Sequence, residues 1–278
     1  MIVKISQLEY SLMQKFIEEQ CGILLEKGKE YLIESRLTDL VVENGCRSFK
    51  EFHEKAQSDN PGKLRDRIVD AMTTNETLFF RDKSTWVYLK EVAVPRLLDM
   101  AEKGGRPRVW SAAASTGQEA YSLVMLLNEG AQARQKPHLL DKIEILGTDI
   151  STSALFLAIA ARYDNMAMGR GTTPSIKKRY FTRTGNVWEF DQTLKKRVTF
   201  KQFNLQNSFI SLGTFDLILC RYVAIYFSKI FKRKLFSKMF RALNGKGVFL
   251  LGATESLRGF SDEFRVTHYK DAVINEKP

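Results

Sequence analysis

The sequence predicts an α/β fold: a doubly wound, mostly parallel sheet with a small antiparallel insertion, preceded by an all-helical N-terminal domain. Three observations predict it. Residues 1–74 show apolar residues near helical spacing and no strand pattern. From Arg108 onward, short apolar strands alternate with helices, which is typical of a doubly wound sheet. Gly185-Asn186 then separates two β-rich runs, as in an antiparallel hairpin.

The N-terminal block is expected to contain four helices within residues 1–74. Apolar residues recur near helical spacing in the first two, at Leu8, Leu12, Phe16, Ile23, Tyr31, Leu32, Leu37 and Leu40. Asn44-Gly45 stops the second helix, and Ser48 has the side chain of an N-cap for the third. Asn60-Pro61-Gly62 breaks the chain before the fourth helix, Lys63 to Met72.

The α/β domain is expected at residues 91–278, after a linker at 75–90 that contributes to the binding pocket. Its predicted strands are Arg108–Ser111, Ile143–Thr148, Phe215–Cys220 and Gly247–Leu251, and its predicted helices are Gly117–Asn128, Ser151–Arg162 and Lys229–Leu243. Val187–Phe190 and Val198–Phe200 are assigned to the inserted β-subdomain, at about 177–203. Strand and helix alternate elsewhere, so the main sheet is expected to be largely parallel.

Composition excludes several classes of protein. Charged residues make up 27% of the chain, which fits a globular domain rather than long disorder. The three cysteines form no CxxC pair and the three histidines are far apart, so a structural zinc site or a disulfide framework is not expected. No apolar run approaches the roughly 20 residues of a membrane span, and no signal-peptide pattern opens the chain. We therefore expect a cytoplasmic protein that does not insert into the membrane.

The net charge of +11 is unevenly distributed and calls for an acidic partner. The helical block carries a slight acidic excess, whereas residues 162–201 and 229–246 each carry a net charge of +7. Solvated lysines on helix faces give the same pattern. A nucleic acid or an acidic protein surface are the two other interpretations, and neither is favoured by charge alone.

The first candidate binding element is a run of very small residues after the first predicted strand. Ala112 to Gly117 leads from that strand into a helix, so a ligand can lie close to the backbone over the helix N-terminus. A plain tight turn has the same appearance. The run lacks the GxxxxGK[ST] pattern of a phosphate-binding loop, which disfavours ATP or GTP hydrolysis.

The second candidate is Asp149, which follows the next predicted strand. An acid at this position accepts hydrogen bonds from the ribose hydroxyls of a nucleoside, or caps the helix that begins near Ser151. Together with the small-residue run, it predicts a nucleoside cofactor at the carboxyl edge of the sheet. NAD and S-adenosylmethionine are equally compatible with these two features.

The third candidate lies where the helical block meets the α/β domain. Asn75-Glu76-Thr77-Leu78-Phe79-Phe80-Arg81-Asp82 places polar residues on either side of an aromatic pair. Such a segment can form a lid over a pocket, or it can be an ordinary linker anchored by the two phenylalanines.

Five segments in order resemble the CheR-type chemotaxis receptor glutamate O-methyltransferases, and together they cover nearly the whole chain. The first, Asn75-Glu76-Thr77-x-Phe79-Phe80-Arg81, resembles the family's NETxFFR signature. The others are Trp110-Ser111-Ala112 with Ser115-Thr116-Gly117-Gln118-Glu119-x-Tyr121-Ser122, then Gly147-Thr148-Asp149-Ile150-Ser151, Asn204-Leu205, and Cys220-Arg221-x-Val223-x-Ile225-Tyr226-Phe227.

This resemblance implies a class I methyltransferase (Rossmann-like) domain behind the helical one. In it, S-adenosylmethionine would donate a methyl group to glutamate side chains of methyl-accepting chemotaxis receptors, with no metal. Carried over by position, the cofactor-binding residues are Asn75, Thr77, Arg81, Glu119, Asp149, Asn204, Leu205, Arg221 and Tyr222. Arg81 and Tyr226 are expected nearest the transferred methyl group and the incoming glutamate. The partners would be the cytoplasmic receptor helices, read by Lys29, Arg36 and Arg47 of a monomeric enzyme.

The chain departs from the family pattern at several positions. Tyr222 replaces an asparagine, so either its ring points away from the cofactor or the pocket is reshaped. The small-residue loop also differs, with Ala113-Ala114 where many relatives carry Gly-Cys. The inserted hairpin is short and has only Gly185, so no docking of a receptor C-terminal pentapeptide is expected.

Two other functions compete with this one. A nucleic-acid methyltransferase should show a target-base motif or a dedicated RNA-binding module, and the sequence has neither. A non-enzymatic relative, which binds the cofactor or another nucleotide as a signalling module, would account for Tyr222 and the altered loop. Binding of the cofactor without methyl transfer would identify that module.

Overall fold

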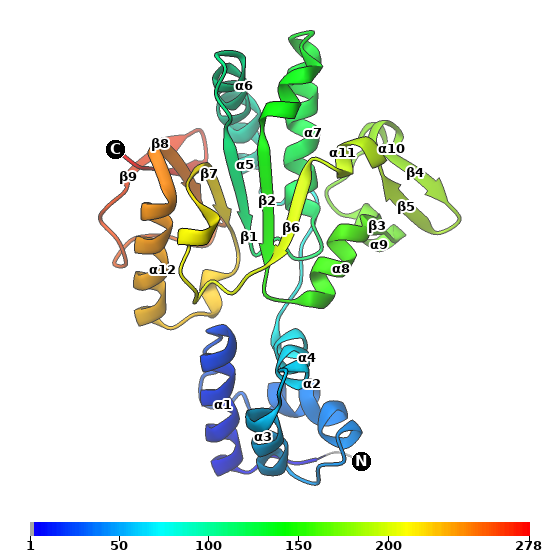
Figure 1. Cartoon of the computed structure of the whole chain (residues 1–278), viewed down its shortest axis with the longest axis vertical. Coiled ribbons are helices and arrows are strands. Elements are labelled where there is room, and N and C mark those ends of the chain that lie inside the picture. The colour runs from blue at the N-terminus through cyan, green and yellow to red at the C-terminus, as the bar shows by residue number, and fades with distance from the viewer. Residues whose placement is uncertain (1–2) are drawn as a thin grey trace.

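The computed structural model describes residues 3–278 and has two parts, a helical domain and a larger α/β domain (Figure 1). The helical domain consists of α1 (Gln7–Cys21), α2 (Glu30–Glu43), α3 (Phe49–Ser58) and α4 (Lys63–Met72). Ser6 and Ser48 cap α1 and α3 with their side chains. The four helices enclose a core of their own, in which Phe49 and Phe52 are fully buried.

The α/β domain is built on a seven-stranded sheet, which confirms the predicted fold class. In spatial order the strands are β6 (Val198–Gln202), β2 (Glu144–Asp149), β1 (Arg108–Ala112), β7 (Phe215–Cys220), β8 (Leu243–Leu250), β10 (Ala272–Glu276) and β9 (Arg265–Tyr269). The first five are parallel, and the last two pair antiparallel at one edge.

Helices cover both faces of this sheet. The chain enters it through α5 (Lys83–Tyr88), a π-helical turn (Leu89–Ala93) and α6 (Val94–Glu102), which run on without a break. With α7 (Gln118–Ala133) they belong to one hydrophobic core, whereas α12 (Lys229–Ala242) packs in a second core. Trp110 and Val109, neighbours on β1, point into different cores because side chains alternate along a strand.

The strand order reverses between β1 and β7. From β1 the chain continues to β2 and β6 on one side, and from β7 to β8, β9 and β10 on the other. At such a switch point the loops leaving adjacent strands diverge and open a crevice at the carboxyl ends. Here those loops are the small-residue segment after Ala112 and the segment that begins at Arg221.

The inserted β-subdomain differs from the prediction in one strand. Its sheet consists of β3 (Arg162–Tyr163), β5 (Val187–Phe190) and β4 (Phe181–Thr184), with the short helices α9 (Asn165–Gly169), α10 (Pro174–Tyr180) and α11 (Gln192–Lys195) around it. Helix α8 (Thr152–Ala160), which leads from β2 to the insertion, packs on β2 and β6 of the main sheet. The assignment of Val198–Phe200 to the insertion was wrong, because β6 pairs parallel with β2 in the main sheet. No helix in the described part of the chain is long and apolar enough to cross a membrane.

Candidate cofactor and active site

A single cleft at the switch point brings together the residues expected to bind the cofactor. Its lining includes Asn75, Thr77, Arg81, Glu119, Asp149, Asn204, Leu205, Arg221 and Tyr222, together with Tyr226. They come from five separate segments of the sequence, which meet because β1, β2 and β7 end at the same edge of the sheet. The interdomain segment is therefore part of the cleft as well as a connection.

In the structure the linker comprises residues 73–82, because the expected segment 75–90 is helical from Lys83 onward, and contacts on both sides hold it in irregular conformation. Phe79 is fully buried and packs edge-on against Tyr163 and Phe181 of the insertion. A side chain on Gly171 would place its Cβ 1.8 Å from the carbonyl oxygen of Phe79, so only glycine permits this approach. The Ser115 hydroxyl also donates to the carbonyl oxygen of Asn75, at 2.9 Å. The polar residues of the linker are thereby fixed over the cleft.

Arg221 forms the buried ionic centre of the site. Its side chain is only 2% exposed, and it reaches the carboxylates of Asp82 at 2.7 Å and Glu119 at 2.8 Å. A further bond, at 2.5 Å, goes to the carbonyl oxygen of Arg81. Burial works to lower the pKa of Arg221, but the two carboxylates outweigh it and raise this pKa. Arg221 therefore connects the linker, through Arg81 and Asp82, to Glu119 in the first turn of α7.

The side chains of Arg81 and Tyr222 stack against each other in the lining of the cleft. The guanidinium carbon of Arg81 lies 3.5 Å from the centroid of the Tyr222 ring, and one of its nitrogens donates to the carbonyl oxygen of Glu76 at 3.1 Å. The Tyr222 hydroxyl donates to Asp82. Burial works to raise the pKa of Asp82, but the bond from Tyr222 and the charge of Arg221 outweigh it, and this pKa is lowered.

Glu255, which sequence reasoning missed, fixes the loop that carries these residues. One of its oxygens accepts the backbone N–H groups of Tyr222 at 2.6 Å and Gly252 at 2.9 Å, and the other accepts that of Ile225 at 3.2 Å. Burial raises the pKa of Glu255, although these backbone donors oppose the shift. Asp82 was missed as well, although it directly follows the NETxFFR signature and its charge was the available signal.

Asp149 holds two backbone segments at the end of β2. Its two oxygens accept the N–H groups of Ser115 at 2.8 Å and Ser151 at 2.9 Å. The side chain of Ser151 caps α8, so the alternative role of Asp149 as the helix cap is filled by Ser151. Burial raises the pKa of Asp149, and the backbone donors oppose it. A carboxylate has further lone pairs, so Asp149 retains acceptor capacity toward the cleft.

The helical domain closes one side of the cleft. Cys21 and Ile23, at the end of α1, belong to its lining, which the sequence did not reveal. The Asn204 amide donates to the carbonyl oxygen of Gln20 at 2.8 Å, and the N–H of Leu24 donates to the carbonyl oxygen of Tyr226 at 2.8 Å. Asn204 thus joins the two domains at the edge of the pocket.

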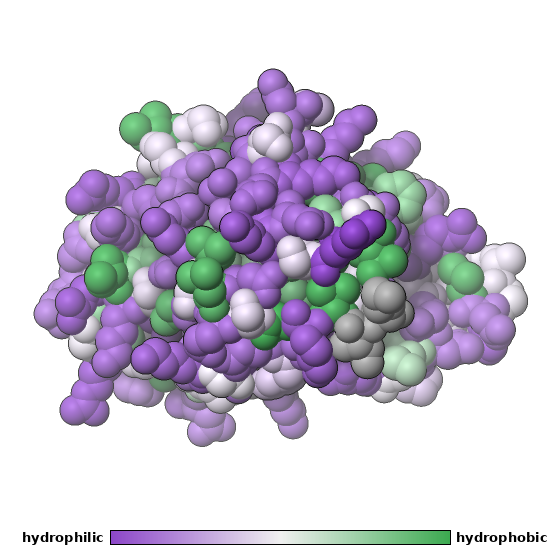
Figure 2. Space-filling view, turned by 90° about the horizontal axis from the view of Figure 1, so that it is seen from below, coloured by the Kyte–Doolittle hydropathy of each residue, from purple (hydrophilic) through white to green (hydrophobic). Residues whose placement is uncertain are grey.

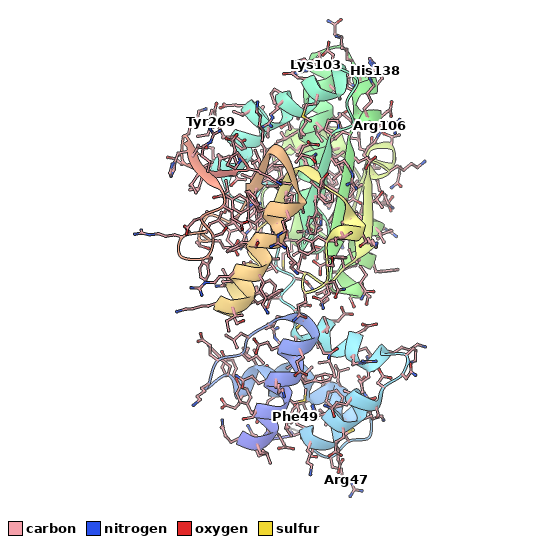
Figure 3. The ribbon with its side chains drawn as sticks, turned by 60° about the vertical axis from the view of Figure 1, so that its left-hand side comes forward. Arg47, Phe49, Lys103, Arg106, His138 and Tyr269 are labelled. Carbon is pink, nitrogen blue, oxygen red and sulfur yellow. The ribbon has the colours of Figure 1, made fainter. Side chains whose placement is uncertain are left out.

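The three cations expected to read the substrate lie outside the cleft. Arg36 donates to the carbonyl oxygen of Met72 at 2.6 Å and to the Thr74 hydroxyl at 3.1 Å, so it holds the start of the linker. Lys29 immediately precedes α2 and lies 5.8 Å from the ring of Tyr31. Arg47 is at the end of the helical domain remote from the sheet (Figure 3).

The donor set of the cleft fits a nucleoside cofactor such as S-adenosylmethionine. Asp149 supplies a buried acceptor for ribose hydroxyls beside a wall of very small residues, Ala113 to Ser115. Phe203 and Leu205 add apolar surface for a flat base. Among residues 3–278, the fully buried Nε of Arg221, which belongs to the same cleft, has no hydrogen-bond partner. Within residues 3–278 no group of three or more His, Cys, Asp or Glu is arranged to hold a metal ion.

Comparison with known proteins agrees with this geometry. Residues 8–73 match the family model described as "CheR methyltransferase, all-alpha domain", and residues 75–273 match "CheR methyltransferase, SAM binding domain". The chain is 40% identical over 267 residues to chemotaxis protein methyltransferase 1 of Pseudomonas aeruginosa, which covers 96% of each chain. It is 41% identical over 274 residues to the chemotaxis protein methyltransferase of Vibrio anguillarum, with 98% of each chain covered. The chain therefore belongs to the CheR methyltransferase family and carries both of its domains, the helical one and the one that binds S-adenosylmethionine.

Proposed function

We propose that this protein transfers a methyl group from S-adenosylmethionine to glutamate side chains of bacterial chemoreceptors, giving glutamyl methyl esters. The observation that carries the proposal is the cleft at the switch point, where all ten residues assigned to cofactor and methyl transfer by resemblance meet. The relatives from Pseudomonas aeruginosa and Vibrio anguillarum, both named chemotaxis protein methyltransferases, support a role in chemotaxis.

The reaction makes few demands on the protein. A glutamate side chain with a pKa of about 4.3 is ionised at pH 7, so no general base is required. When bound, S-adenosylmethionine supplies an electrophilic methyl group. The residues of the cleft must then exclude water and hold the carboxylate in line, and such positioning contributes roughly 7–11 kcal/mol.

Arg81 is the residue we assign to the carboxylate. Within residues 3–278 its guanidinium makes one hydrogen bond, to the carbonyl oxygen of Glu76, so most of its N–H groups remain for a ligand. Arg221 cannot take this role, because its charge is already balanced by Asp82 and Glu119. Tyr226 belongs to the lining of the same cleft and is assigned to supply a phenol or a ring edge near the methyl group.

The receptor would approach along the helical domain. Hydrophilic residues cover most of the end of this domain, with scattered hydrophobic side chains between them (Figure 2). Lys29 and Arg47 remain our candidates for contact with the acidic receptor helices, whereas Arg36 acts mainly through the linker. We place the reaction in the cytoplasm, where the methylated receptor helices lie, and propose a monomeric enzyme.

The test is transfer of radiolabelled methyl groups from S-adenosylmethionine to membranes that carry the organism's own chemoreceptors. Label on the receptor band that is released by mild alkali is the expected result, because a glutamyl ester is hydrolysed under these conditions and an N-methyl group is not. Arg81→Ala should reduce this label strongly. Cofactor binding by calorimetry with no transfer to any receptor would instead identify a non-enzymatic signalling module.

A further inference from the structure

The backbone at Tyr222 is in a conformation that tyrosine rarely adopts. Its φ angle is +59°, in the left-handed region where asparagine is several-fold enriched and bulky side chains are outliers. The chain has therefore placed a less suitable residue at a strained position, and strained backbone at a functional site is a reason to look for a role of the side chain.

The contacts of Tyr222 indicate what that role is. Its ring lies against the Arg81 guanidinium at 3.5 Å, close enough for face-on cation–π contact, and its hydroxyl donates to Asp82. Its own N–H is held by Glu255. A Cβ on Gly252 would lie 3.0 Å from the ring, so the absence of a side chain there makes room for the phenol. An asparagine could satisfy the backbone but could not stack on Arg81.

We infer that Tyr222 is a positioning residue, which holds the Arg81 guanidinium over the cleft and links it through Asp82 to the Arg221–Glu119 pair. Asp82 accepts hydrogen bonds from both Tyr222 and Arg221, so it connects the stacked Tyr222 ring to the buried ion pair. This inference rests on the proposed function of Arg81. It predicts that the ring acts on turnover only through Arg81 and contributes little to the stability of the fold.

The experiment is a double-mutant cycle with Tyr222→Asn, Arg81→Ala and the double variant, each measured for kcat, KM for S-adenosylmethionine and thermal unfolding. Tyr222→Asn should lower kcat by about threefold to thirtyfold, the range of a cation–π contact, while leaving thermal stability equal or higher because asparagine tolerates φ > 0. In the Arg81→Ala background the same substitution should lower kcat by less than twofold. Tyr222→Phe, which keeps the ring and loses only the hydroxyl, should fall between wild type and Tyr222→Asn.

Tyr269 provides the matched control. It also donates its hydroxyl to a carboxylate, Glu91 at 2.8 Å, and has a cation, Lys270, 5.4 Å from its ring. It lies on the surface of the α/β domain far from the helical domain (Figure 3), so Tyr269→Asn should leave kcat unchanged. Equal losses from Tyr222→Asn with and without Arg81 would overturn the inference, as would a Tyr222→Asn enzyme with wild-type kcat.

The two proposals can fail separately. If the wild-type protein transfers no label to receptors, the proposed function fails, and the cycle is then run on calorimetric affinity for S-adenosylhomocysteine. Coupling between Tyr222 and Arg81 in that affinity would still support the positioning role, whereas additive effects would reject it.

Discussion

Replacement of Arg221 by methionine tests whether the buried ionic centre holds the site together. The substitution keeps most of the aliphatic volume but removes three bonds, to Asp82, Glu119 and the carbonyl oxygen of Arg81. It leaves two carboxylates, 15% and 12% exposed, without their cation. Breaking a buried pair in this way costs about 3–5 kcal/mol.

The structure places the expected cost near the lower end of that range. Asp82 keeps bonds from Tyr222 and from the N–H of Ala253, and Glu119 keeps the bond from Ser111. We therefore expect Arg221→Met to lower the free energy of unfolding by about 3 kcal/mol. For a chain of this size the loss corresponds to a melting temperature roughly 6–12 °C lower.

Urea denaturation followed by circular dichroism measures the loss of unfolding free energy. Equal m-values for wild type and variant check that both undergo the same unfolding transition. The double variant Glu119→Gln/Arg221→Met removes one of the orphaned charges and should regain about 1 kcal/mol. Arg265→Met is the control, because the Arg265 side chain is exposed and its ion pair with Glu276 should be worth less than about 1 kcal/mol. A loss from Arg221→Met no larger than that of the control would refute the reasoning.

Three further predictions concern the linker and α12. Gly171→Ala should lower the free energy of unfolding by at least about 2 kcal/mol in thermal denaturation, because its Cβ would overlap a linker carbonyl. Gly185→Ala is the control: it is also at positive φ but has open space around it, so its loss of unfolding free energy should be smaller. Burial, aided by neighbouring positive charge, lowers the pKa of Lys238 to about 8. The free energy of unfolding should therefore rise with pH between about 8 and 10.5, and urea titrations of Lys238→Met should lack this rise. Arg36→Met should weaken cofactor affinity in calorimetry about threefold by loosening the linker, whereas Arg47→Met should have no effect.

The fold class and several element boundaries followed from local sequence signals. Helix α4 and strands β5 and β7 begin and end at the predicted residues, because apolar periodicity and turn residues are properties of a short window of chain. The elements that were not predicted include β9, β10 and the helical run from Lys83 to Glu102. Within that run α6 is clearly amphipathic, with Val94, Leu97, Leu98 and Ala101 buried, so its sequence carried a helical signal that was overlooked. Strand β9 is an edge strand with little buried surface, so its sequence carries little hydrophobic signal.

Motif resemblance identified the residues of the cleft, but the contacts that each of them makes could be assigned only from the tertiary structure. The alternation in Val198–Gln202 is the same for an edge strand of a parallel sheet and for a hairpin strand, so only its pairing with β2 assigns it. Likewise, sequence identified Arg221, Asn204 and Arg36 as polar groups of a site or a surface, whereas packing decides that they bind Glu119, Gln20 and the linker. By itself the sequence determined which chemistry is present and the local structure that carries it. Which groups meet depended on long-range contacts between segments, because hydrogen bonds and ion pairs are chosen by distance in space and not by position in the chain.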